Sequence, residues 1–281
     1  MTALLSIVNK ILIFAKSPIK GKVKTRLKKD TPLTDEDILK LYTAFLKDTI
    51  ISASLSKAQK IYIAYYPEDS RDLMYDIVFQ SSIFNLQSSI ELFPQSGNDF
   101  DDRLTNALQN IHNKNSYNIV ILGSDSPHIQ PSTINKAFKF LSTPNSELRT
   151  PNFNGAMVLG PSGEGGVYLI GLKSAIRNPQ SAINFKGIFT SGNESDNLLQ
   201  IAKRKKMPLI ILEELTDVDV KSDLITLVSN LSIMEYSSRH TKIHLPQYTL
   251  CVIRELGLTV DREGRGTREK FLSLASSKRS G

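Results

Sequence analysis

Short apolar runs rich in β-branched residues alternate with helical patterns along most of this chain, and this alternation restricts the folds open to it. The runs predicted to be strands span 7–15, 60–66, 90–93, 118–123, 156–159, 166–172 and 208–212. Helical patterns are predicted over 35–54, 99–112, 131–141, 194–205 and 221–229. Strands that alternate with helices favour a mainly parallel sheet with helices on both faces. We therefore predict an α/β fold, a three-layer sandwich.

The two strands predicted at 156–159 and 166–172 depart from this rhythm. A glycine-rich turn, GPSGEGG at 160–166, connects them in place of a helix. Two strands joined by a short turn are typical of an antiparallel hairpin. The sheet is therefore expected to be mixed, although mainly parallel.

A chain of 281 residues is long enough for one large α/β domain with an appendage. We place the domain at 1–230 and a basic C-terminal extension at 231–281. The extension contains apolar pieces and then a Gly/Arg-rich stretch, DREGRGTREK. The sequence leaves open whether this extension is an appended unit or a partly disordered segment.

Composition excludes several classes of protein. No stretch approaches the ~20 apolar residues that a membrane-spanning helix needs. The N-terminal run is interrupted by Asn9 and Lys10 and lacks a small-residue cleavage site, which favours a first strand over a signal peptide. The single cysteine, Cys251, excludes an internal disulfide framework and fits a reducing compartment. A cytoplasmic protein without a membrane span is expected.

Positive charge is concentrated in one loop that follows the first predicted strand. Seven of the 14 residues from 16 to 29 are Lys or Arg, and none is acidic. Pro18 and Gly21 break the loop, which is predicted to lead into a helix. The start of a helix favours anions, and Lys and Arg side chains bind phosphate oxygens. Judged on charge alone, a solvated basic loop without a ligand is the alternative.

The distribution of charge argues against a nucleic-acid interface. The net charge of the whole chain is +7, which is also the excess of the 16–29 loop alone. Such focal charge is typical of a small anion site, whereas nucleic-acid binders carry an extended basic stripe. The sequence also lacks zinc-finger and heptad patterns. No nucleic-acid partner is expected; a binder that uses the loop and the basic tail is the alternative, and its affinity would depend steeply on salt.

Two acidic motifs follow predicted strands. Asp125, in GSDSP, comes directly after one strand, at the carboxyl edge where open α/β sheets bind ligands. Asp217 and Asp219 follow another strand, and their side chains project to the same side if the segment is extended. Carboxylates in such places can hold Mg²⁺ or Mn²⁺. The alternatives are that Asp125 opens a turn and that Asp219 or Ser222 caps the next helix.

Two more segments are candidate ligand-contact loops. The glycine turn at 160–166 allows close approach of a ligand to the backbone, although such turns usually only reverse the chain. The stretch QSGNDFDDRL at 95–104 gathers polar groups at a strand-to-helix junction, where Asn98 or Asp99 can equally cap the helix. The sequence has no G-x-S-x-G elbow and no Walker A motif.

Taken in chain order, these segments resemble a known family. FAKSPIKGKVKTRL, QSGNDFDDRL, GSDSP, GPSGEGGVYLIGL and TDVDVKSDL fall in the order of the motifs of the glycosyltransferase-A-like proteins, a domain of unknown function of the selenodomain-associated transferase type. The resemblance covers roughly residues 8 to 230. The first and last motifs are also similar to those of 2-phospho-lactate guanylyltransferase and other small nucleotidyltransferases.

The resemblance implies a nucleotide-diphospho-sugar transferase (glycosyltransferase-A) fold, a Mg²⁺ or Mn²⁺ ion, and a nucleotide or nucleotide-sugar with a small-molecule acceptor. By motif match it places phosphate contacts at Lys16, Gly21, Lys24 and Arg26, further ligand contacts at Gly165 and Gly166, and the metal at Asp125 and Asp219, with Asp219 preferred to Asp217. Lys24, Arg26 and Asp125 are then the residues expected to take part in catalysis.

The chain departs from the family pattern at two places. The family's glycine hairpin usually carries an Asp and two aromatic residues where this chain has Glu164, Val167 and Tyr168. Relatives commonly have a Trp in the region of 187–195, and this chain has no Trp. Both departures fall on the expected acceptor or sugar side. We expect a metal-dependent transferase; glycosyl transfer, nucleotidyl transfer and nucleotide binding without turnover all remain open.

Overall fold

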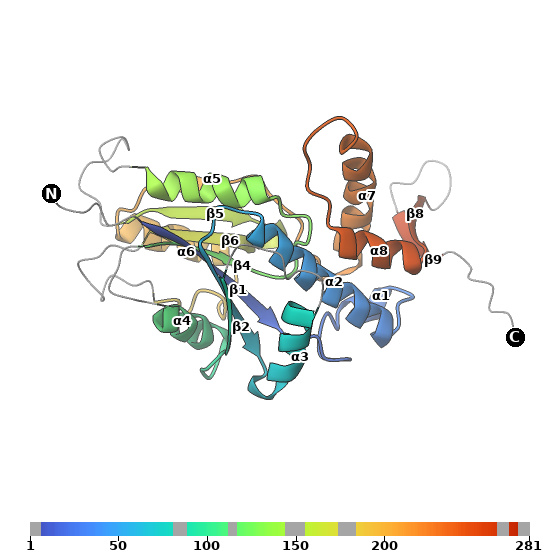
Figure 1. Cartoon of the computed structure of the whole chain (residues 1–281), viewed down its shortest axis with the longest axis horizontal. Helices are drawn as coiled ribbons and strands as arrows, with labels where there is room; N and C mark the ends of the chain where they lie inside the picture. The colour runs from blue at the N-terminus through green and yellow to red at the C-terminus, as the bar shows by residue number, and fades with distance from the viewer. Residues whose placement is uncertain are drawn as a thin grey trace, which may run out of the picture.

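The computed structural model describes residues 7–80, 89–111, 117–143, 155–173, 184–262 and 270–274. Within these ranges one sheet has seven strands in the order β3-β2-β1-β4-β6-β5-β7 (Figure 1). The strands are β1 (Val8–Lys16), β2 (Lys60–Tyr66), β3 (Ser89–Pro94), β4 (Tyr117–Leu122), β5 (Met157–Pro161), β6 (Val167–Lys173) and β7 (Leu209–Ile211). In this sheet β6 pairs antiparallel with both β4 and β5, and the other recorded pairings are parallel. The mainly parallel, mixed sheet is confirmed.

Helices cover both faces of this sheet, which confirms the three-layer α/β architecture (Figure 1). Helices α2 and α5 pack on one face, and α4 and α6 pack on the other. The helices are α1 (Leu27–Asp30), α2 (Asp35–Ser54), α3 (Arg71–Tyr75), α4 (Phe100–Ile111), α5 (Pro131–Ser142), α6 (Glu194–Arg204), α7 (Lys221–Ser237) and α8 (Gln247–Glu255). None of those in the described ranges has the length and hydropathy of a bilayer span.

Alternation along β1 supplies both hydrophobic cores. Ile11 and Ile13 pack in the cluster that includes α2 and α5, whereas Leu12 and Phe14 pack in the cluster that includes α4 and α6. Successive side chains of a strand point to opposite faces, so a central strand covered on both sides needs an unbroken apolar run. This is why β1 reads as a continuous hydrophobic segment in the sequence.

The order of the strands creates a crevice at the carboxyl ends of β1 and β4. From β1 the chain passes to β2 and β3 on one side, and it returns as β4 on the other side of β1. In open α/β sheets, ligands bind at such a switch point, outside the carboxyl ends of the strands. The basic loop leaves β1 at this edge, and the GSDSP motif leaves β4 at the same edge.

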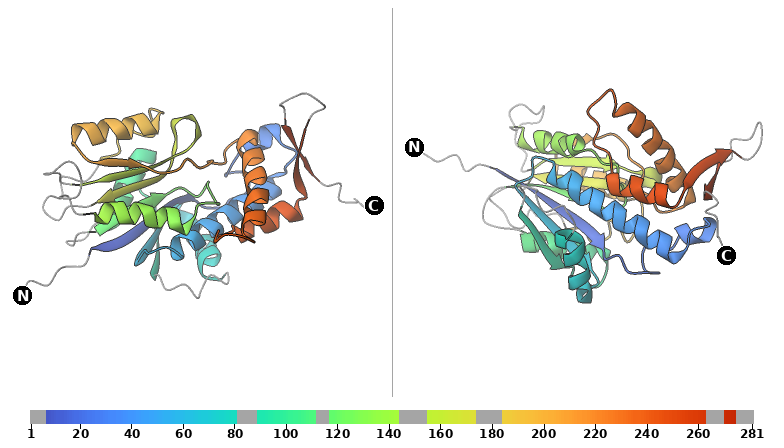
Figure 2. Two further views of the ribbon diagram at one scale, coloured as in Figure 1. Left: turned by 90° about the horizontal axis from the view of Figure 1, so that it is seen from above. Right: turned by 45° about the vertical axis from the view of Figure 1, so that its right-hand side comes forward.

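The C-terminal part of the chain packs at the end of the molecule where α1 and α2 begin (Figure 2). Helices α7 and α8 form a third hydrophobic cluster with α2. The two-stranded ribbon of β8 (Leu258–Arg262) and β9 (Lys270–Leu274) also contributes side chains to this cluster. Its buried members include Phe45, Leu224 and Leu250. Helix α7 runs without a break through residue 230. The division at that residue stays a prediction, and the described residues after it form helices and strands.

The structure adds elements that the sequence pattern did not predict. These are α3, the one-turn 3₁₀ helix Glu68–Ser70, the π-helical turn Asp76–Gln80, α8 and the β8–β9 ribbon. The predicted helix at 99–112 is observed as α4, and its last predicted residue lies outside the described ranges. Short elements of this kind depend on tertiary packing and leave little periodicity to detect.

A buried carboxylate fixes α8 onto α2. Asp48, on α2, is fully buried, and its two oxygens accept hydrogen bonds from the backbone N–H of Tyr248 (3.2 Å) and of Thr249 (2.7 Å). These N–H groups belong to the first turn of α8, which has no partner for them within its own helix. Burial raises the pKa of Asp48 to about 6, against the hydrogen bonds that favour its charged form.

The raised pKa of Asp48 predicts a pH-dependent contribution to stability. The folded protein holds a proton on this group at pH values where the unfolded chain, with a pKa of about 4, has released it. The contribution is therefore fully present below about pH 4 and is lost as pH rises through about 6. In Asp48→Asn the titration is absent. The unfolding free energy of Asp48→Asn relative to wild type should thus increase by about 3 kcal/mol between pH 4 and pH 8, measured by urea denaturation. A difference that is constant over this range would contradict the assignment.

Candidate functional site

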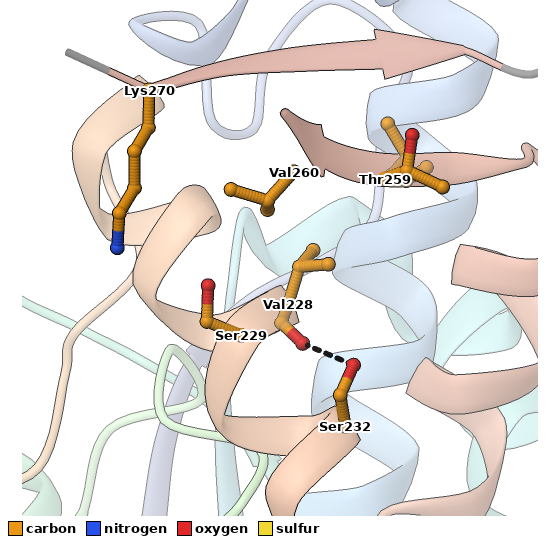
Figure 3. Close-up of a pocket in the computed structure, with 7 residues that line it drawn as sticks. Val228, Ser229, Ser232, Thr259, Val260 and Lys270 are labelled. Carbon is orange, nitrogen blue, oxygen red and sulfur yellow. Dashed lines mark hydrogen bonds between the residues drawn. The ribbon is translucent and has the colours of Figure 1, made fainter. Parts of the chain in front are cut away.

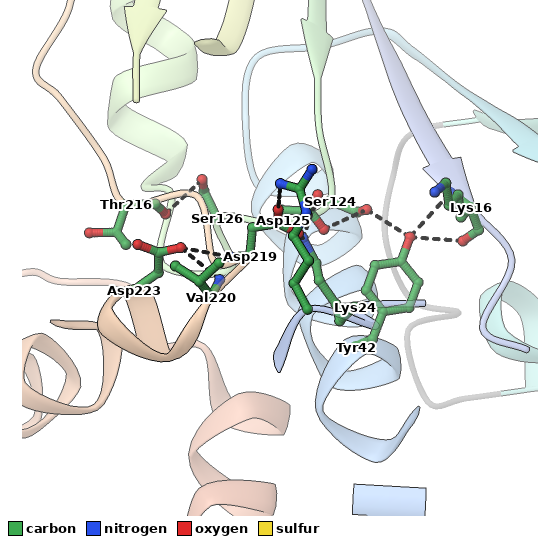
Figure 4. Close-up of polar contacts among 11 residues, drawn as sticks. Lys16, Lys24, Tyr42, Ser124, Asp125, Ser126, Thr216, Asp219, Val220 and Asp223 are labelled. Carbon is green, nitrogen blue, oxygen red and sulfur yellow. Dashed lines mark hydrogen bonds and ion pairs between the residues drawn. The ribbon is translucent and has the colours of Figure 1, made fainter. Parts of the chain in front are cut away.

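Lys24 draws two acidic segments together at the carboxyl edge of the sheet (Figure 4). Its ammonium lies 2.8 Å from Oδ2 of Asp125 and 3.8 Å from Oδ1 of Asp219. The side chain is only 7% exposed, and the backbone adopts a left-handed conformation with φ of +47°. Few residues other than Gly and Asn adopt this conformation readily, so the surrounding contacts must hold Lys24 in place.

Arg26, two positions after Lys24 in the same loop, contacts the same site. Its guanidinium donates to Oδ2 of Asp219 at 2.5 Å, while 70% of the side chain is exposed. A guanidinium carries five N–H donors, so an arginine bonded in this way keeps donors for an anion. Lys24 is therefore the buried cation of the site and Arg26 is the accessible one.

The segment after β7 crosses the carboxyl edge of the sheet and binds to the end of β4. The N–H of Val218 donates to the carbonyl of Asp125 at 3.0 Å, and the hydroxyl of Ser126 donates to the carbonyl of Thr216 at 2.9 Å. Val218 is fully buried in the C-terminal cluster, whereas its two neighbours in the D-V-D motif are partly exposed. This is the alternation expected of an extended segment.

Asp223, rather than Asp219 or Ser222, caps the N-terminus of α7. The carboxylate of Asp223 accepts from the N–H of Asp219 at 3.0 Å and from that of Val220 at 2.9 Å. The side chain of Asp219 is consequently left to face Lys24 and Arg26. The alternative in which Asp219 only caps the helix is wrong, because a different carboxylate performs that role.

Tyr42 lies on α2, and its hydroxyl group connects the end of β1 with the segment that follows β4. Its hydroxyl donates to the carbonyl of Lys16 (2.8 Å), accepts from the N–H of the same residue (3.1 Å), and lies 3.0 Å from Oγ of Ser124 (Figure 4). Burial, together with the nearby charge of Asp125, raises the pKa of Tyr42, so the hydroxyl stays protonated. In the sequence Tyr42 is one member of the apolar stripe of its helix, and no local signal marks it as part of the site.

The site carries three carboxylates close to two cations. Burial of the Lys24 ammonium opposes its charge, but the carboxylates of Asp125, Asp217 and Asp219 outweigh this and raise its pKa. Burial, with the charge of Asp125, raises the pKa of Asp217 to about 7. Three carboxylates against two cations leave at most one uncompensated negative charge at the site, and the raised pKa of Asp217 removes part of it near pH 7.

The carboxylate oxygens of Asp125 and Asp219 are ligands of the kind that a hard divalent cation prefers. Their oxygens converge on one cation, the ammonium of Lys24. No group of three or more His, Cys, Asp or Glu side chains in the described ranges is arranged to hold a metal. Mg²⁺ commonly takes one or two carboxylates and completes its coordination with water and substrate phosphates. Two converging carboxylates therefore fit a metal that is shared with a phosphate ligand.

The remaining predicted phosphate contacts lie in the same loop. Lys16 ends β1 with an exposed side chain, and Gly21 has a φ of +71°, which a turn of the loop requires. The loop leads into a helix as predicted, but this helix, α1, is a single turn of four residues. Phosphate binding by the loop stays a prediction. The loop can present side chains to an anion, but it offers no helix dipole of useful length.

Gly165 and Gly166 lie at the same edge of the sheet, in the turn between β5 and β6. The register places Leu122 of β4 opposite Leu169 of β6, which brings this turn toward the end of β4. The N–H of Gly166 donates to the carbonyl of Gly163 at 3.1 Å, and the carbonyl of Gly166 accepts from the N–H of Ser162 and the hydroxyl of Ser195. These backbone groups are occupied within the protein, so a role in ligand contact stays a prediction.

The polar segment at 95–104 anchors a second loop. As the capping alternative predicted, Asp99 accepts from the N–H of Asp102 at the start of α4. Asp101 is almost fully buried, and its carboxylate accepts from the N–H groups of Gly187 and Phe189 and from the hydroxyl of Thr190. Asp101 was part of a quoted motif, but its sequence context does not reveal that it holds the 187–190 loop.

The cap on α7 gives a prediction that separates the two candidate capping residues. Asp223→Ala should lower the free energy of unfolding by about 1 kcal/mol, because two backbone N–H groups lose their acceptor. Ser222→Ala, which changes the neighbouring exposed side chain, should alter it by less than about 0.5 kcal/mol. Urea denaturation of both variants measures the difference. Equal effects, or a larger loss for Ser222→Ala, would show that Asp223 does not carry the cap.

Comparisons with solved structures support the fold. A protein of Desulfovibrio desulfuricans G20, described as a candidate nucleotide-diphospho-sugar transferase, matches with a TM-score of 0.66 at 23% identity, over 89% of this chain and 95% of that one. A cytidylyltransferase of Leptospira borgpetersenii serovar Hardjo-bovis matches at 0.49 and 14%, over 89% and 95%. A Mycobacterium tuberculosis H37Rv protein in complex with manganese matches at 0.42 and 14%, over 79% and 99%. The first likeness shows that the two chains share a fold.

Sequence comparison assigns the family. No curated protein matches the chain. The family model DUF2064, described as "Uncharacterized protein conserved in bacteria", matches residues 49–192, just over half of the chain. The matched region includes the strand that leads to Asp125 and the glycine turn between β5 and β6. The chain therefore belongs to the DUF2064 family.

Proposed function

We propose that this protein is a metal-dependent transferase that acts on a nucleoside triphosphate or a nucleotide-sugar and transfers a nucleotidyl or glycosyl group to a small acceptor. The observation that carries the proposal is the convergence of Lys24 and Arg26, from the basic loop, on Asp125 and Asp219. This convergence lies at the switch point between β1 and β4, where α/β sheets of this kind bind ligands. The likeness of fold to a candidate nucleotide-diphospho-sugar transferase supports the same assignment.

Charge stabilisation is the chemistry that this site can supply. Transfer from a nucleotide donor leaves negative charge on a departing phosphate group, and positioned cations lower the barrier for this step. Arg26 is accessible and can grip two phosphate oxygens at once, while Lys16 adds an exposed ammonium at the end of β1. Lys24 contributes a nearly buried positive charge next to Asp125. No covalent intermediate with the protein is needed.

Asp125 and Asp219 are the residues that would hold Mg²⁺ or Mn²⁺. Such an ion, when bound, would supply positive charge that offsets the negative charge of the donor phosphates. Because Lys24 contacts both carboxylates, its ammonium occupies the place where they could share an ion. Lys24 would then have to turn toward the phosphates, a movement that its long side chain allows.

The two forms of transfer differ in the bond that is broken. In nucleotidyl transfer an acceptor oxygen bonds to the α-phosphorus, the bond from that phosphorus to the β-phosphate breaks, and pyrophosphate leaves. In glycosyl transfer the acceptor oxygen bonds to the anomeric carbon, the bond from that carbon to the β-phosphate oxygen breaks, and a nucleoside diphosphate leaves. Where the acceptor is a hydroxyl group, its proton passes to water. Identification of the released product, pyrophosphate or nucleoside diphosphate, decides between them.

The basic loop offers a matched pair of arginine and lysine substitutions. The Arg26 and Lys20 side chains are both exposed (70% and 61%), and each pairs with a carboxylate, but only Arg26 pairs with Asp219. Arg26→Ala should weaken binding of nucleoside triphosphates in the presence of Mg²⁺ about 10- to 150-fold, the range expected for lost bonds to a charged group. Lys20→Ala should change it less than about threefold. Isothermal titration calorimetry measures both; similar losses would indicate diffuse attraction by the loop.

Asp125→Asn tests metal binding separately from phosphate binding by the basic loop, because the amide keeps the shape of the carboxylate but loses its charge. Wild-type protein should bind its best nucleoside triphosphate or nucleotide-sugar more tightly with Mg²⁺ or Mn²⁺ than with EDTA. The variant should lose this metal-dependent gain, by tenfold or more, and keep the affinity measured in EDTA. A gain that survives the substitution would exclude Asp125 as a metal ligand. Nucleotide binding without product release over a broad acceptor panel would contradict transfer and leave a binding protein.

A further inference from the structure

A small apolar cavity opens beside the candidate site, on the face of the sheet that α4 covers. Its volume is about 70 Å³, and its lining includes Phe14 of β1, Phe100 of α4, Gly123 after β4, Val167 and Tyr168 of β6, and Phe189 of the 187–190 loop. Three strands, one helix and one loop thus contribute to a single small space.

The aromatic wall of this cavity is firmly held. The ring of Phe100 contacts that of Phe14 edge-on, with centroids 5.0 Å apart, and lies 4.8 Å from that of Phe189. Asp101 keeps Phe189 in place, because its buried carboxylate accepts the N–H of Phe189 at 2.9 Å and the hydroxyl of Thr190 at 2.6 Å. A wall that is fixed by a buried carboxylate is less free to collapse into the cavity.

The cavity adjoins the acidic site through Gly123. This residue is exposed, and a Cβ built on it would meet no heavy atom within 4 Å. Gly123 lies two positions before Asp125 in the chain. Gly123 therefore both lines the apolar cavity and lies in the segment that leads to Asp125, whose carboxylate contacts Lys24.

The side chains that line the cavity favour an apolar part of a ligand over a polar one. The single hydroxyl in the lining, that of Tyr168, already donates to the carbonyl of Glu213 at 2.9 Å. A sugar hydroxyl placed in this space would lose its hydrogen bonds to water and gain none, which is costly. For scale, a cavity of about 150 Å³ lined by apolar side chains holds benzene, a ring of six carbons. About half that volume corresponds to a chain of about three carbons.

We propose that this cavity is the acceptor subsite and that it binds a short alkyl chain of about three carbons, with the nucleophilic oxygen of the acceptor at Gly123, facing Asp125. The acceptor role rests on the proposed function, because it needs a transferase site at Asp125. The acceptor class is then a small alcohol with an apolar tail. Polyhydroxylated acceptors are disfavoured in the cavity, because its side chains are apolar except for Tyr168, whose hydroxyl is already bonded.

Binding of straight-chain alcohols tests the size and polarity of the cavity directly. Chemical-shift perturbation with ethanol, 1-propanol, 1-butanol and 1-hexanol should show affinity that rises about fourfold per added methylene, the value for burial of apolar surface. The rise should stop at three or four carbons, when the cavity is full. Glycerol, with three carbons and three hydroxyls, should not perturb the lining. Affinity that is independent of chain length, or equal binding of glycerol, would overturn the proposal.

A matched pair of valines controls for non-specific effects. Val167→Thr keeps the shape of the side chain but adds a hydroxyl to the lining, and it should weaken 1-propanol binding about fivefold or more. Val260→Thr makes the same change in a half-buried strand residue that lines a separate cavity, of about 380 Å³, between α7 and the β8–β9 ribbon (Figure 3). That variant should leave 1-propanol binding unchanged. An effect of Val260→Thr that equals or exceeds the effect of Val167→Thr would place the alcohol elsewhere.

Substitution of Gly123 gives a second variant that is expected to fold as the wild-type protein does. A methyl group at this position meets no neighbour, so Gly123→Ala should keep the thermal stability of the protein while it narrows the mouth of the cavity. Weaker 1-propanol binding in this variant supports the entrance at Gly123, and unchanged binding contradicts it. If the wild-type protein binds nucleotide but no straight-chain alcohol, the cavity proposal alone is overturned. Alcohol binding in a protein that binds no nucleotide overturns the proposed function, and the acceptor role with it.

Discussion

The contact between Lys24 and Asp125 is the interaction on which the arrangement of the candidate site depends. It joins the loop after β1 to the end of β4, across the switch point of the sheet. The ammonium is nearly buried, so it needs the carboxylates around it; removal of a partner would leave a charge in a poorly solvated place, which is far more costly than the loss of an exposed ion pair. The left-handed backbone at Lys24 and the hydroxyl of Tyr42 hold the two strand ends at this spacing.

The C-terminal part of the chain supports the other half of the site. Val218 is fully buried in the cluster formed by α2, α7 and α8, and its N–H donates to the carbonyl of Asp125. Asp223 caps α7 and so leaves the carboxylate of Asp219 to face the cations. Asp48 fixes α8 against α2 behind this cluster. The packing of the segment after residue 230 is therefore linked to the position of Asp219, although it contributes none of the charged groups discussed above.

The strands and long helices follow from the sequence because each has a strong periodic or continuous apolar pattern. Asp125 and Asp219 could be placed at the same edge for a related reason, since Asp125 follows β4 by three positions and Asp219 lies in the segment that follows β7. Tyr42 and Asp101 could not be identified, because their roles consist of contacts to residues about 26 to 89 positions away. The length of α1 was also beyond prediction. A run of Lys and Arg gives no indication that the helix after the loop ends within one turn.

In the proposed function, a divalent ion and a phosphate ligand bind at the point where Lys24 now bridges Asp125 and Asp219. Anomalous diffraction at the manganese edge, from crystals grown with Mn²⁺ and the nucleotide that binds most tightly, tests this site directly. We expect an anomalous peak within about 2.3 Å of oxygens from both Asp125 and Asp219, with Lys24 turned toward phosphate oxygens. A manganese peak elsewhere, or a nucleotide whose phosphates avoid this edge of the sheet, would contradict it.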